Sequence, residues 1–159
     1  MENNFDIKSF ARKTILEEAK AVEKLAEYID DELEQVIDLI YNCNGRVIVS
    51  GIGKSAIIAS KIVATMNSTG TPAFFMHAAD AIHGDLGLIQ PEDVIIILSK
   101  SGNTPEIKAL VPLVKNLGNK LVGMVSSTDS YLALNSDFVL KATVEKEACP
   151  NNLAPTSST

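Results

Sequence analysis

The sequence predicts an α/β protein in which helices cover both faces of a mostly parallel sheet of about five strands, as in flavodoxin-like folds. Three observations predict this fold class. Short runs between residues 46 and 141 are continuously apolar, as in parallel strands that are buried on both faces. Helical stretches lie between these runs, and glycines follow where the helices would end. A chain of 159 residues can bury the core of one such domain, so we expect residues 1–159 to form a single unit.

The residues before the first expected strand predict two helices. Apolar side chains recur there at alternating steps of four and three residues, which places them on one helical face. The members of this face are Ile15, Ala19, Val22, Ala26, Ile29, Leu33, Val36 and Ile40. Asp31 and Glu34 can cap a new helix, so we expect the break near Asp30. The apolar face can pack on the domain's own sheet or against a partner subunit, and both can hold at once.

The strands and the helices between them alternate along the rest of the chain. The expected strands are residues 46–50, 72–76, 93–99, 120–125 and 137–141. One helix is expected over residues 55–68, where Gly70 can end it, and another over residues 104–117, followed by Gly118. Pro112 lies inside the second helix and removes a backbone hydrogen bond, so that helix need not be straight.

Composition excludes several classes of partner. The net charge of −6 argues against a general affinity for nucleic acid or for anionic membranes. The N-terminus lacks the pattern of a signal peptide, and no run approaches the roughly 18 apolar residues of a membrane span. We therefore expect a cytoplasmic protein. Cys43 and Cys149 belong to no Cys-x-x-Cys pair or metal-ligand pattern, which favours two reduced thiols.

The loop after the first strand reads Ser-Gly-Ile-Gly-Lys-Ser and resembles a nucleotide-binding loop. A Walker loop needs glycine where Ile48 stands, so an ATPase of that type is not expected. Gly51, Gly53 and Ala56 do satisfy the spacing of a dinucleotide fingerprint. That fingerprint also needs an acid at the end of the next strand, where His77 stands. The dinucleotide interpretation stays open as a weaker alternative.

A second glycine loop, Ser-Lys-Ser-Gly-Asn-Thr, follows the third strand and predicts a phosphate site. Ser99, Ser101, Asn103 and Thr104 surround Gly102, directly before a helix. Hydroxyls, backbone amides and a helix N-terminus together hold one phosphate without a large positive charge. A helix cap alone needs only one such residue. Residues of both loops are candidates to bind the phosphate: Ser50, Gly51, Gly53, Ser55, Ser99, Lys100, Ser101, Gly102, Asn103 and Thr104.

Four motifs together resemble the sugar isomerase (SIS) domain of the D-arabinose 5-phosphate isomerases. They are SGIGKS, HAADAIHGDLG, SKSGNTPEI and VEKEACPNNLAPTSST, and the resemblance covers residues 46–159 in order. It implies a SIS fold and the interconversion of D-ribulose 5-phosphate and D-arabinose 5-phosphate, the first step towards 3-deoxy-D-manno-octulosonate of lipopolysaccharide and capsule. It also implies a homotetramer and raises the question of feedback by a downstream sugar nucleotide. Many family members carry CBS domains after this one, and nothing similar is present here.

Aldose–ketose isomerisation passes a proton between two carbons through an enediolate. It needs a base, a donor that stabilises the oxyanion and a grip on the phosphate, but no metal or organic cofactor. The resemblance implies an active site lined by Lys54, His83, Glu106 and Glu147. Taken without the resemblance, the position of Lys54 at the sheet's carboxyl edge still favours a site role over a solvated lysine. His83 is then as well explained as a capping or core histidine, and Glu106 and Glu147 as surface glutamates.

Each of these side chains has an expected role. Lys54 can neutralise an enediolate oxygen, and His83 can move a proton between oxygens because imidazole titrates near pH ~6.5. Glu106 lies in a first helical turn, where the dipole stabilises its charged form, so binding or orientation suits it. Glu147 is the expected proton-transfer carboxylate, and His77 is a structural or secondary contact.

The sequence departs from the family pattern in three ways. Asn103 stands where many relatives have an acid, and Lys100 adds a charge to the loop. The family's His-Pro-Gly-Gly stretch would follow the helix that Thr156 or Ser157 can cap, so we expect a C-terminal segment beyond Thr159. Without that histidine the chain would bind phosphate but turn over poorly, unless a neighbouring subunit supplies one.

Two expectations of a different kind complete the sequence interpretation. His83 and Asp85 can pick up zinc adventitiously, which would inhibit rather than assist. A non-catalytic SIS module that senses sugar phosphates or sugar nucleotides is the alternative to an isomerase.

Overall fold

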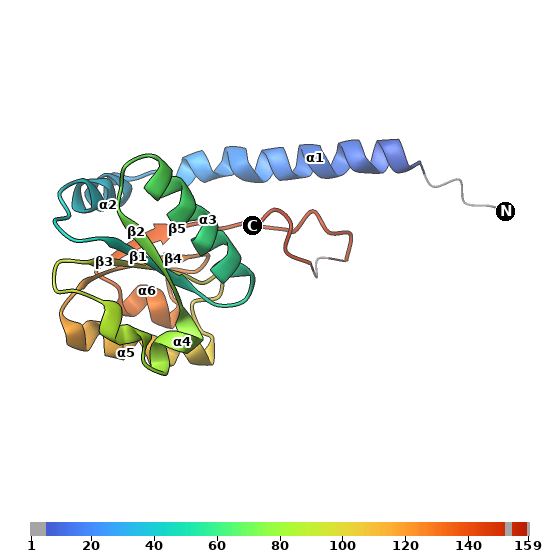
Figure 1. Ribbon diagram of the computed structural model, residues 1–159. Helices are drawn as coiled ribbons and strands as arrows, with labels where there is room; N and C mark the ends of the chain where they lie inside the picture. The colour runs from blue at the N-terminus through green and yellow to red at the C-terminus, as the bar shows by residue number, and fades with distance from the viewer. Residues whose placement is uncertain (1–5, 152–153, 159) are drawn as a thin grey trace.

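The computed structural model describes residues 6–151 and 154–158 and has helices on both faces of a five-stranded, all-parallel sheet (Figure 1). The strands stand in the order β2-β1-β3-β4-β5. Their bounds are β1 (Val47–Gly51), β2 (Ala73–His77), β3 (Val94–Leu98), β4 (Lys120–Val125) and β5 (Phe138–Lys141). Each strand therefore lies within about one residue of its expected range, and the predicted fold class is confirmed.

The helices divide between the two faces of the sheet. The first face carries α2 (Asp31–Tyr41) and α3 (Lys54–Ser68), whereas the other carries α4 (Ala78–Ile82), α5 (Pro105–Leu117) and α6 (Tyr131–Asn135) (Figure 1). The short helices α4 and α6, and the 3-10 turn η2 (Asp85–Leu88), were not predicted from the sequence. They are only four or five residues long, which is too short for the helical period to show.

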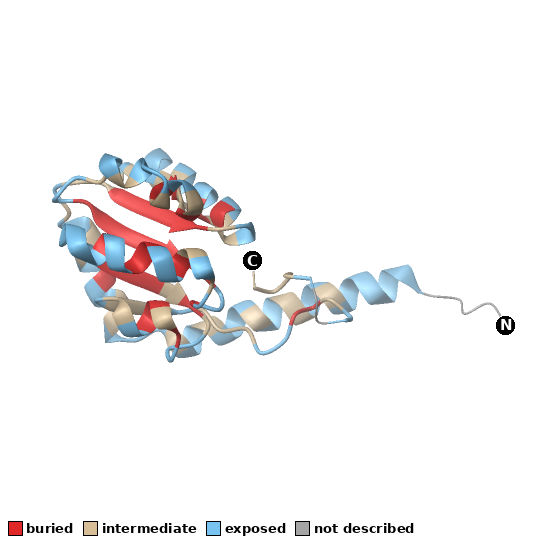
Figure 2. Ribbon diagram, turned by 90° about the horizontal axis from the view of Figure 1, so that it is seen from below, coloured by how far each residue is buried: buried red, intermediate tan, exposed pale blue. Residues whose placement is uncertain are grey.

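The core forms two apolar layers, one on each side of the sheet. Ile48 and Ile95 face the layer under α5, while Val47 and Val49 face the layer under α2 and α3. Successive side chains of a strand point to opposite faces, so an unbroken apolar run fills both layers. All residues of β1 and β3 are buried, whereas the edge strands β2 and β5 are partly exposed (Figure 2).

Glycine and proline act in α5 largely as expected. Gly118 ends the helix in the left-handed region, with a φ of 81° that suits glycine. Pro112 lies inside the helix and leaves it continuous from Pro105 to Leu117. The helix between β1 and β2 ends at Ser68, just before Gly70, as predicted.

The N-terminal apolar face packs on the domain's own sheet only in part. In α2, Val36 is buried and Ile40 packs against the second core layer. The preceding helix, α1 (Ile7–Lys24), has no buried residue and extends away from the sheet (Figure 1). The 3-10 turn η1 (Leu25–Tyr28) joins the two helices, so the predicted break near Asp30 is confirmed.

The residue that caps α2 differs from the expected one. Asp30, rather than Asp31, is the cap, because its carboxylate accepts hydrogen bonds from the amides of Glu32 and Leu33 at 3.1 and 3.3 Å. Asp31 is the first residue of the helix. Either of the two neighbouring aspartates could cap the helix as far as the sequence shows, and the extended backbone of Asp30 identifies it as the cap.

The amino edge of the sheet is closed by a buried ion pair. Asp93, directly before β3, accepts hydrogen bonds from the Arg46 amide at 2.8 Å and from the Arg46 guanidinium at 2.7 Å. The Gln90 amide donates to the same carboxylate at 2.8 Å, and Asn119 donates to the Asp93 carbonyl at 2.8 Å. This network ties the starts of β1, β3 and β4 together.

The described helices also bear on the membrane question. Across residues 6–151 and 154–158, none of the helices combines the length and the apolar character that crossing a bilayer requires.

Candidate active site

The strand order places a crevice at the carboxyl edge of the sheet. The chain leaves β1 towards β2 on one side and continues from β3 on the other, so β1 and β3 form the switch point of the topology. Gly51 and Leu98, the last residues of these two strands, are register partners. Ligands of open α/β sheets bind beyond the strand ends at such a point. Both glycine loops of the sequence therefore begin side by side.

The first loop leads from β1 into α3. Gly53 has a φ of 59°, which favours glycine, and α3 begins with Lys54, which is exposed. A Cβ on Gly51 would lie 3.0 Å from the backbone of Ser55, so α3 starts close against the strand end. The Oγ of Ser50 is buried and has no hydrogen-bond partner among the described residues.

The second loop, residues 99–104, is shaped largely by its own polar groups. Ser99 Oγ accepts from the Gly102 amide at 3.1 Å, and Ser101 Oγ accepts from the Asn103 amide at 3.3 Å. Asn103 Oδ1 accepts from the Tyr131 amide at 3.0 Å, which binds the loop to α6. Ser99 and Ser101 act as acceptors in these bonds, and each hydroxyl retains a hydrogen that can be donated to a ligand.

Gly102 allows the second loop to approach α6 closely. Its φ is 62°, and a Cβ there would lie 2.3 Å from Ser130 Oγ. No side chain other than hydrogen fits at this position, because such a contact is shorter than any real Cβ contact. The tight turn aims the loop at the start of α5.

Thr104 stands at the N-terminal cap position of α5 without capping it. Its side chain makes no capping hydrogen bond, and its Oγ1 is buried without a partner in the part of the chain that the structure describes. A threonine at this position ordinarily accepts from an amide of the first turn. A polar group left unpaired beside a helix N-terminus is suited to an anionic ligand.

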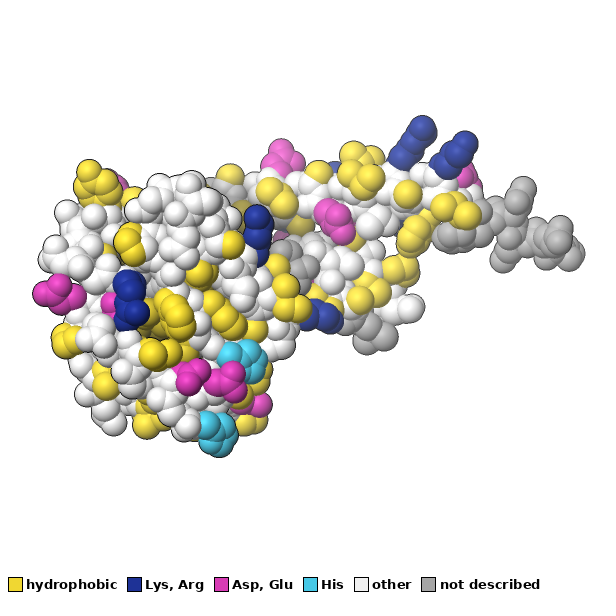
Figure 3. Space-filling model, viewed as in Figure 1, with side chains coloured by type: hydrophobic (Ala, Val, Ile, Leu, Met, Phe, Trp, Pro, Cys, Tyr) yellow, Lys and Arg dark blue, Asp and Glu magenta, His cyan; other side chains and the backbone are white. Residues whose placement is uncertain are grey.

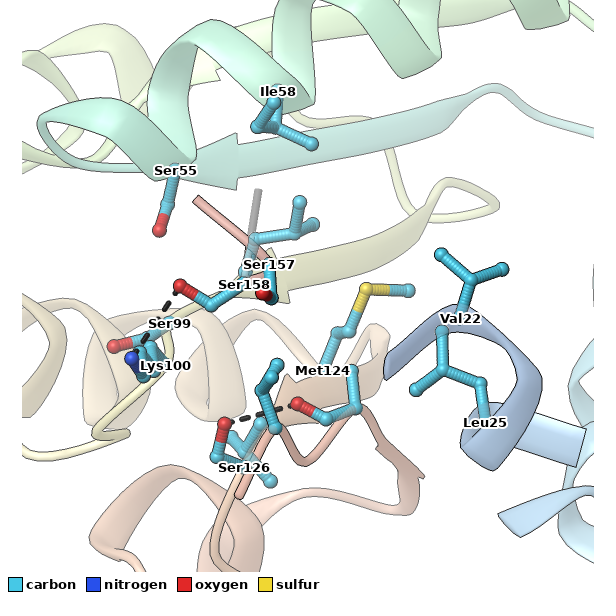
Figure 4. A pocket seen from close by; sticks show the side chains of 14 residues that line it. Val22, Leu25, Ser55, Ile58, Ser99, Lys100, Met124, Ser126, Ser157 and Ser158 are labelled. Carbon is cyan, nitrogen blue, oxygen red and sulfur yellow. Dashed lines mark hydrogen bonds between the residues drawn. The ribbon is translucent and has the colours of Figure 1, made fainter. Parts of the chain in front are cut away.

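A cavity of about 280 Å³ opens beside these loops (Figure 4). One part of its wall is polar and consists of Ser55, Ser99, Lys100, Ser126, Ser157 and Ser158. The other part is apolar and includes Val22, Leu25, Ile58, Met124 and Val144. The cavity can therefore hold a small molecule with a polar end directed at the second loop.

Glu147 is buried, with 6% of its side chain exposed, and it pairs with Lys100 and Ser158, two residues of the polar wall of this cavity. Lys100 Nζ donates to its Oε1 at 2.5 Å, and Ser158 Oγ donates to the same oxygen. The amides of Thr156 and Ser158 donate to Oε2 at 2.8 and 3.2 Å. Burial alone would raise the pKa of Glu147, but the bonds from Lys100, Ser158 and Thr156 outweigh it and lower the pKa to about 2. In this arrangement the carboxylate is charged and is a weak base.

The remaining predicted catalytic side chains lie around the same sheet edge. Glu106 is half-buried in the first turn of α5, where the expected helix dipole acts on it. His83 is exposed at the C-terminal end of α4, and no hydrogen bond or ion pair among the described residues joins it to Lys54, Glu106 or Glu147. The single chain thus brings Lys100 and Glu147 together but leaves His83 apart.

His77 lies near one carboxylate, and the surroundings of His83 and Asp85 bear on the expected zinc contact. His77 ends β2, and its Nδ1 lies 3.8 Å from the Asp80 carboxylate. Among residues 6–151 and 154–158, no group of three or more His, Cys, Asp or Glu side chains could hold a metal ion. Since β2 ends in His77, the dinucleotide interpretation also lacks the acid that it needs there.

Several site residues escaped the sequence interpretation. Ser126 follows β4 and lines the cavity, although a lone serine after a strand gives no signal. Ser157 and Ser158 were considered only as part of a helix start, whereas their hydroxyls bind Ala148 N and Glu147 Oε1. Residues 156–158 form a bend and turn, and the structure describes too little beyond them to test the expected helix.

The profile of the SIS domain family matches residues 39–159, which is most of the chain. The chain belongs to the SIS domain family. The match begins inside α2 and includes the whole sheet and both glycine loops.

Relatives with assigned activities are also similar to this SIS domain. Arabinose 5-phosphate isomerase KpsF of Escherichia coli O6:H1 is 49% identical over 149 residues, which cover 93% of this chain and 46% of that protein. Arabinose 5-phosphate isomerase KdsD of Pseudomonas aeruginosa is 47% identical over 159 residues, or 100% of this chain and 49% of that protein. The chain thus spans about half the length of the curated relatives it matches.

A solved structure shares the fold closely. Escherichia coli CFT073 c3406 in complex with arabinose 5-phosphate superposes with a TM-score of 0.93 at 41% identity. The superposition covers 98% of this chain and 83% of that chain. The sheet, the flanking helices and the N-terminal helix therefore recur in a protein that holds a sugar phosphate.

Proposed function

We propose that this SIS domain catalyses the interconversion of D-arabinose 5-phosphate and D-ribulose 5-phosphate. The observation that carries the proposal is the buried Glu147 carboxylate beside the phosphate-type loop, in a chain 49% identical to KpsF. The unpaired Thr104 hydroxyl at the start of α5 adds a place for the phosphate. The cavity lined by Ser99 and Lys100 is of a size for a small ligand.

The phosphate would sit on the loop of residues 99–104. The hydroxyls of Ser99, Ser101 and Thr104 would donate to its oxygens, with Lys100 as the nearby cation. The loop of residues 50–55, at the end of the neighbouring strand, would contact the sugar or the same phosphate. Binding through several donors at once fixes the orientation of the carbon chain.

The reaction would then move one proton between carbons. Glu147 takes the proton from C2 of the aldose, and the C2–H electron pair forms an enediolate with its negative charge on O1. Lys54 stabilises that charge, while His83 carries a proton from O2 to O1. Protonation at C1 by the same carboxyl group gives the ketose. Glu106 orients a hydroxyl of the substrate.

This activity would supply arabinose 5-phosphate for the synthesis of 3-deoxy-D-manno-octulosonate. The substrates are soluble metabolites, so the proposal places the protein in the cytoplasm. A downstream sugar nucleotide is a candidate feedback ligand. Neither a metal ion nor an organic cofactor takes part in the proposed steps.

We further propose that the protein assembles through α1 into a homo-oligomer, with a tetramer as the expected form. Ile15, Leu16 and Val22 of this helix are 64%, 62% and 65% exposed. Figure 3 shows yellow apolar side chains along the length of α1. A helix of 18 residues without any buried side chain is unlike a helix that packs only on its own domain.

Turnover of arabinose 5-phosphate by the purified chain tests the proposal. Ribulose 5-phosphate is expected to appear until the two sugars reach equilibrium, with full-length KdsD as the reference enzyme. Binding of the sugar phosphate without any product would instead make the chain a sensing module.

Fluorescence titration with NADPH tests the dinucleotide alternative, for which no change is expected. Light scattering of Leu16→Glu is expected to show smaller particles than those of the unaltered chain.

A further inference from the structure

Lys100 links the phosphate-type loop to the buried carboxylate. Its backbone belongs to the loop, where its carbonyl accepts from the Ser126 amide at 3.1 Å, while its Nζ reaches Glu147 Oε1 at 2.5 Å. Ser158 Oγ lies 3.4 Å from the same Nζ. One cation therefore belongs to the expected phosphate loop and contacts the expected proton acceptor. Figure 4 shows Lys100 beside Ser99 and Ser158 in the cavity.

The two partners of this ion pair differ in freedom. The Lys100 side chain is 52% exposed and hangs on a flexible stem, whereas Glu147 is 6% exposed. Glu147 is also held from the other side by the amides of Thr156 and Ser158 and by their hydroxyls. If the pair separates, Lys100 is the partner that moves and the carboxylate stays in place.

A bound phosphate would compete directly for Lys100. Phosphate monoesters carry about two negative charges at neutral pH and offer three acceptor oxygens, against one charge on the carboxylate. The neighbouring Ser99 lines the same cavity as Lys100, so an anion held by the loop lies within reach of the Lys100 ammonium. The energy of a charged pair rises with the charge and falls with distance, which favours transfer of the lysine to the dianion.

We propose that Lys100 is a positioning residue that exchanges partners, binding Glu147 until the substrate's phosphate draws it away and so leaves the carboxylate able to accept a proton. This inference rests on the proposed isomerase function and adds a specificity device to it. The protein would then require the phosphate for chemistry as well as for binding, because an unphosphorylated sugar leaves Lys100 on Glu147. The lysine remains an ammonium throughout, and no proton passes through it.

The groups around Glu147 determine how the basicity of its carboxylate changes when Lys100 leaves. Burial opposes its charge, and Lys100 supplies a large part of the compensation. The other charged side chains near it line the groove towards α1: Glu17, Lys20, Lys24, Glu145 and Lys146. Lys24 is paired with Glu145 at 2.7 Å, so these groups partly cancel each other. Departure of Lys100 therefore makes the carboxylate a stronger base.

Carboxylate NMR of the intact chain tests the exchange without relying on turnover. With ¹³C-labelled glutamate and Glu147→Gln for assignment, the Glu147 signal is expected to stay in its charged position from about pH 7 to about pH 4. Saturating inorganic phosphate, added at about pH 7.5 where it is largely a dianion, is expected to move the Glu147 carboxylate signal, because the Lys100 ammonium leaves that oxygen. A signal that phosphate binding leaves unmoved overturns the inference. Lack of phosphate binding overturns it as well.

Kinetics with two sugars separates exchange from a merely structural ion pair. In Lys100→Met, hydrogen exchange at C2 of unphosphorylated D-arabinose is expected to rise by about tenfold, while kcat/KM for arabinose 5-phosphate falls by about tenfold or more. A structural role predicts that both rates fall together, and that result overturns the inference. Lys100→Arg is expected to restore the preference for the phosphorylated sugar. Lys108→Met, at an exposed position on α5, serves as the matched control.

The failures of the two proposals are distinguishable. If the unaltered chain does not isomerise arabinose 5-phosphate, the proposed function fails. If it does, and Lys100→Met lowers both rates without changing their ratio, only the exchange of partners fails.

Discussion

Asp93 at the amino edge of the sheet and Glu147 at the carboxyl edge are both buried carboxylates paired with a cation. Asp93 is paired with Arg46, and the pair sits in a network that includes Gln90 and Asn119. Glu147 is paired with a lysine on a loop. The three buried side-chain atoms without a hydrogen-bond partner in the described residues belong to Ser50, His77 and Thr104.

All three of those atoms lie near the carboxyl edge, since Ser50 is the last residue but one of β1, His77 ends β2 and Thr104 follows β3. Leaving a buried polar group unpaired costs about 1–3 kcal/mol, so a fold tolerates several at one edge only where something else requires them. The amino edge holds the strands together with permanent partners. The carboxyl edge leaves three polar side-chain atoms unpaired among the described residues and holds its carboxylate partly through a half-exposed lysine. This difference is the one expected if the amino edge is structural and the carboxyl edge holds the proposed site.

The largest expected effect is on turnover at the carboxyl edge. Glu147→Gln removes the proposed proton acceptor, and the rate of arabinose 5-phosphate isomerisation is expected to fall by about 10³-fold. The matched change at the other edge, Asp93→Asn, is expected to leave kcat per folded molecule unchanged. Steady-state assays of both variants measure this, and equal losses in the two would remove the functional distinction between the edges.

The same Asp93→Asn change has its effect on stability. Its carboxylate is fully buried, and Asn cannot replace the charge that faces Arg46, so unfolding in urea is expected to become easier by about 2 kcal/mol. The figure is moderate because Arg46 is 36% exposed and can be solvated. Glu92→Gln, at the exposed position next to it, is the control and should change little. A fully stable Asp93→Asn would contradict the role of this network.

The pH dependence of the free energy of unfolding is expected to show a smaller effect of the carboxylates at the two edges of the sheet. The pKa of Glu147 is about 2 against an ordinary 4.5, so this group stabilises the fold above about pH 4.5 and loses its contribution as the pH falls towards 2. Because Lys100 is half exposed, solvent screens its ion pair with Glu147. The contribution of Glu147 to the free energy of unfolding is therefore about 1–2 kcal/mol. The pKa of Asp93 is also lowered, because the bonds from Arg46 and Gln90 outweigh its burial.

Urea midpoints measured from about pH 6 to about pH 3 test this dependence. In Glu147→Gln and in Asp93→Asn, the urea midpoint should fall less steeply as the pH is lowered than it does in the unaltered chain. In the double variant it should fall less steeply than in either single variant. The two effects should add, because a whole strand separates the sites. An unchanged slope in Glu147→Gln would contradict the lowered pKa.

The smallest expected effect concerns Thr104. Its Oγ1 has no partner to lose among the described residues, so Thr104→Val should leave the free energy of unfolding unchanged or slightly increased. The KM for arabinose 5-phosphate should rise by about tenfold, because one donor to the phosphate is gone. Thr128→Val, at an exposed position of the same sheet edge, is the matched control. A destabilised Thr104→Val with normal KM would assign the hydroxyl to the fold.

The sequence was informative where a pattern repeats. Continuous apolar runs predicted every strand, since both faces of the sheet are covered. Gly102 and Gly118 marked a tight loop and a helix end because both have positive φ values. The apolar face before β1 predicted helices, but not that α2 would pack on the sheet while α1 would stay exposed.

The site was predictable as a set of motifs rather than as a geometry. The two glycine loops meet because β1 and β3 are neighbours, which follows from the strand order and not from any local signal. The pairing of Lys100 with Glu147 joins residues 47 positions apart, and the sequence suggested neither this contact nor the low pKa that results from it. Ser126 and Ser158 likewise become site residues only through the fold.

Exchange of the C2 hydrogen of arabinose 5-phosphate in deuterated water shows whether this chain removes the proton. The chain is expected to catalyse loss of the C2 proton signal in the NMR spectrum, and Lys54→Ala and Glu147→Gln are expected to abolish this loss while Lys61→Ala retains it. A chain that binds the sugar phosphate yet leaves the C2 proton in place would contradict the proposed function.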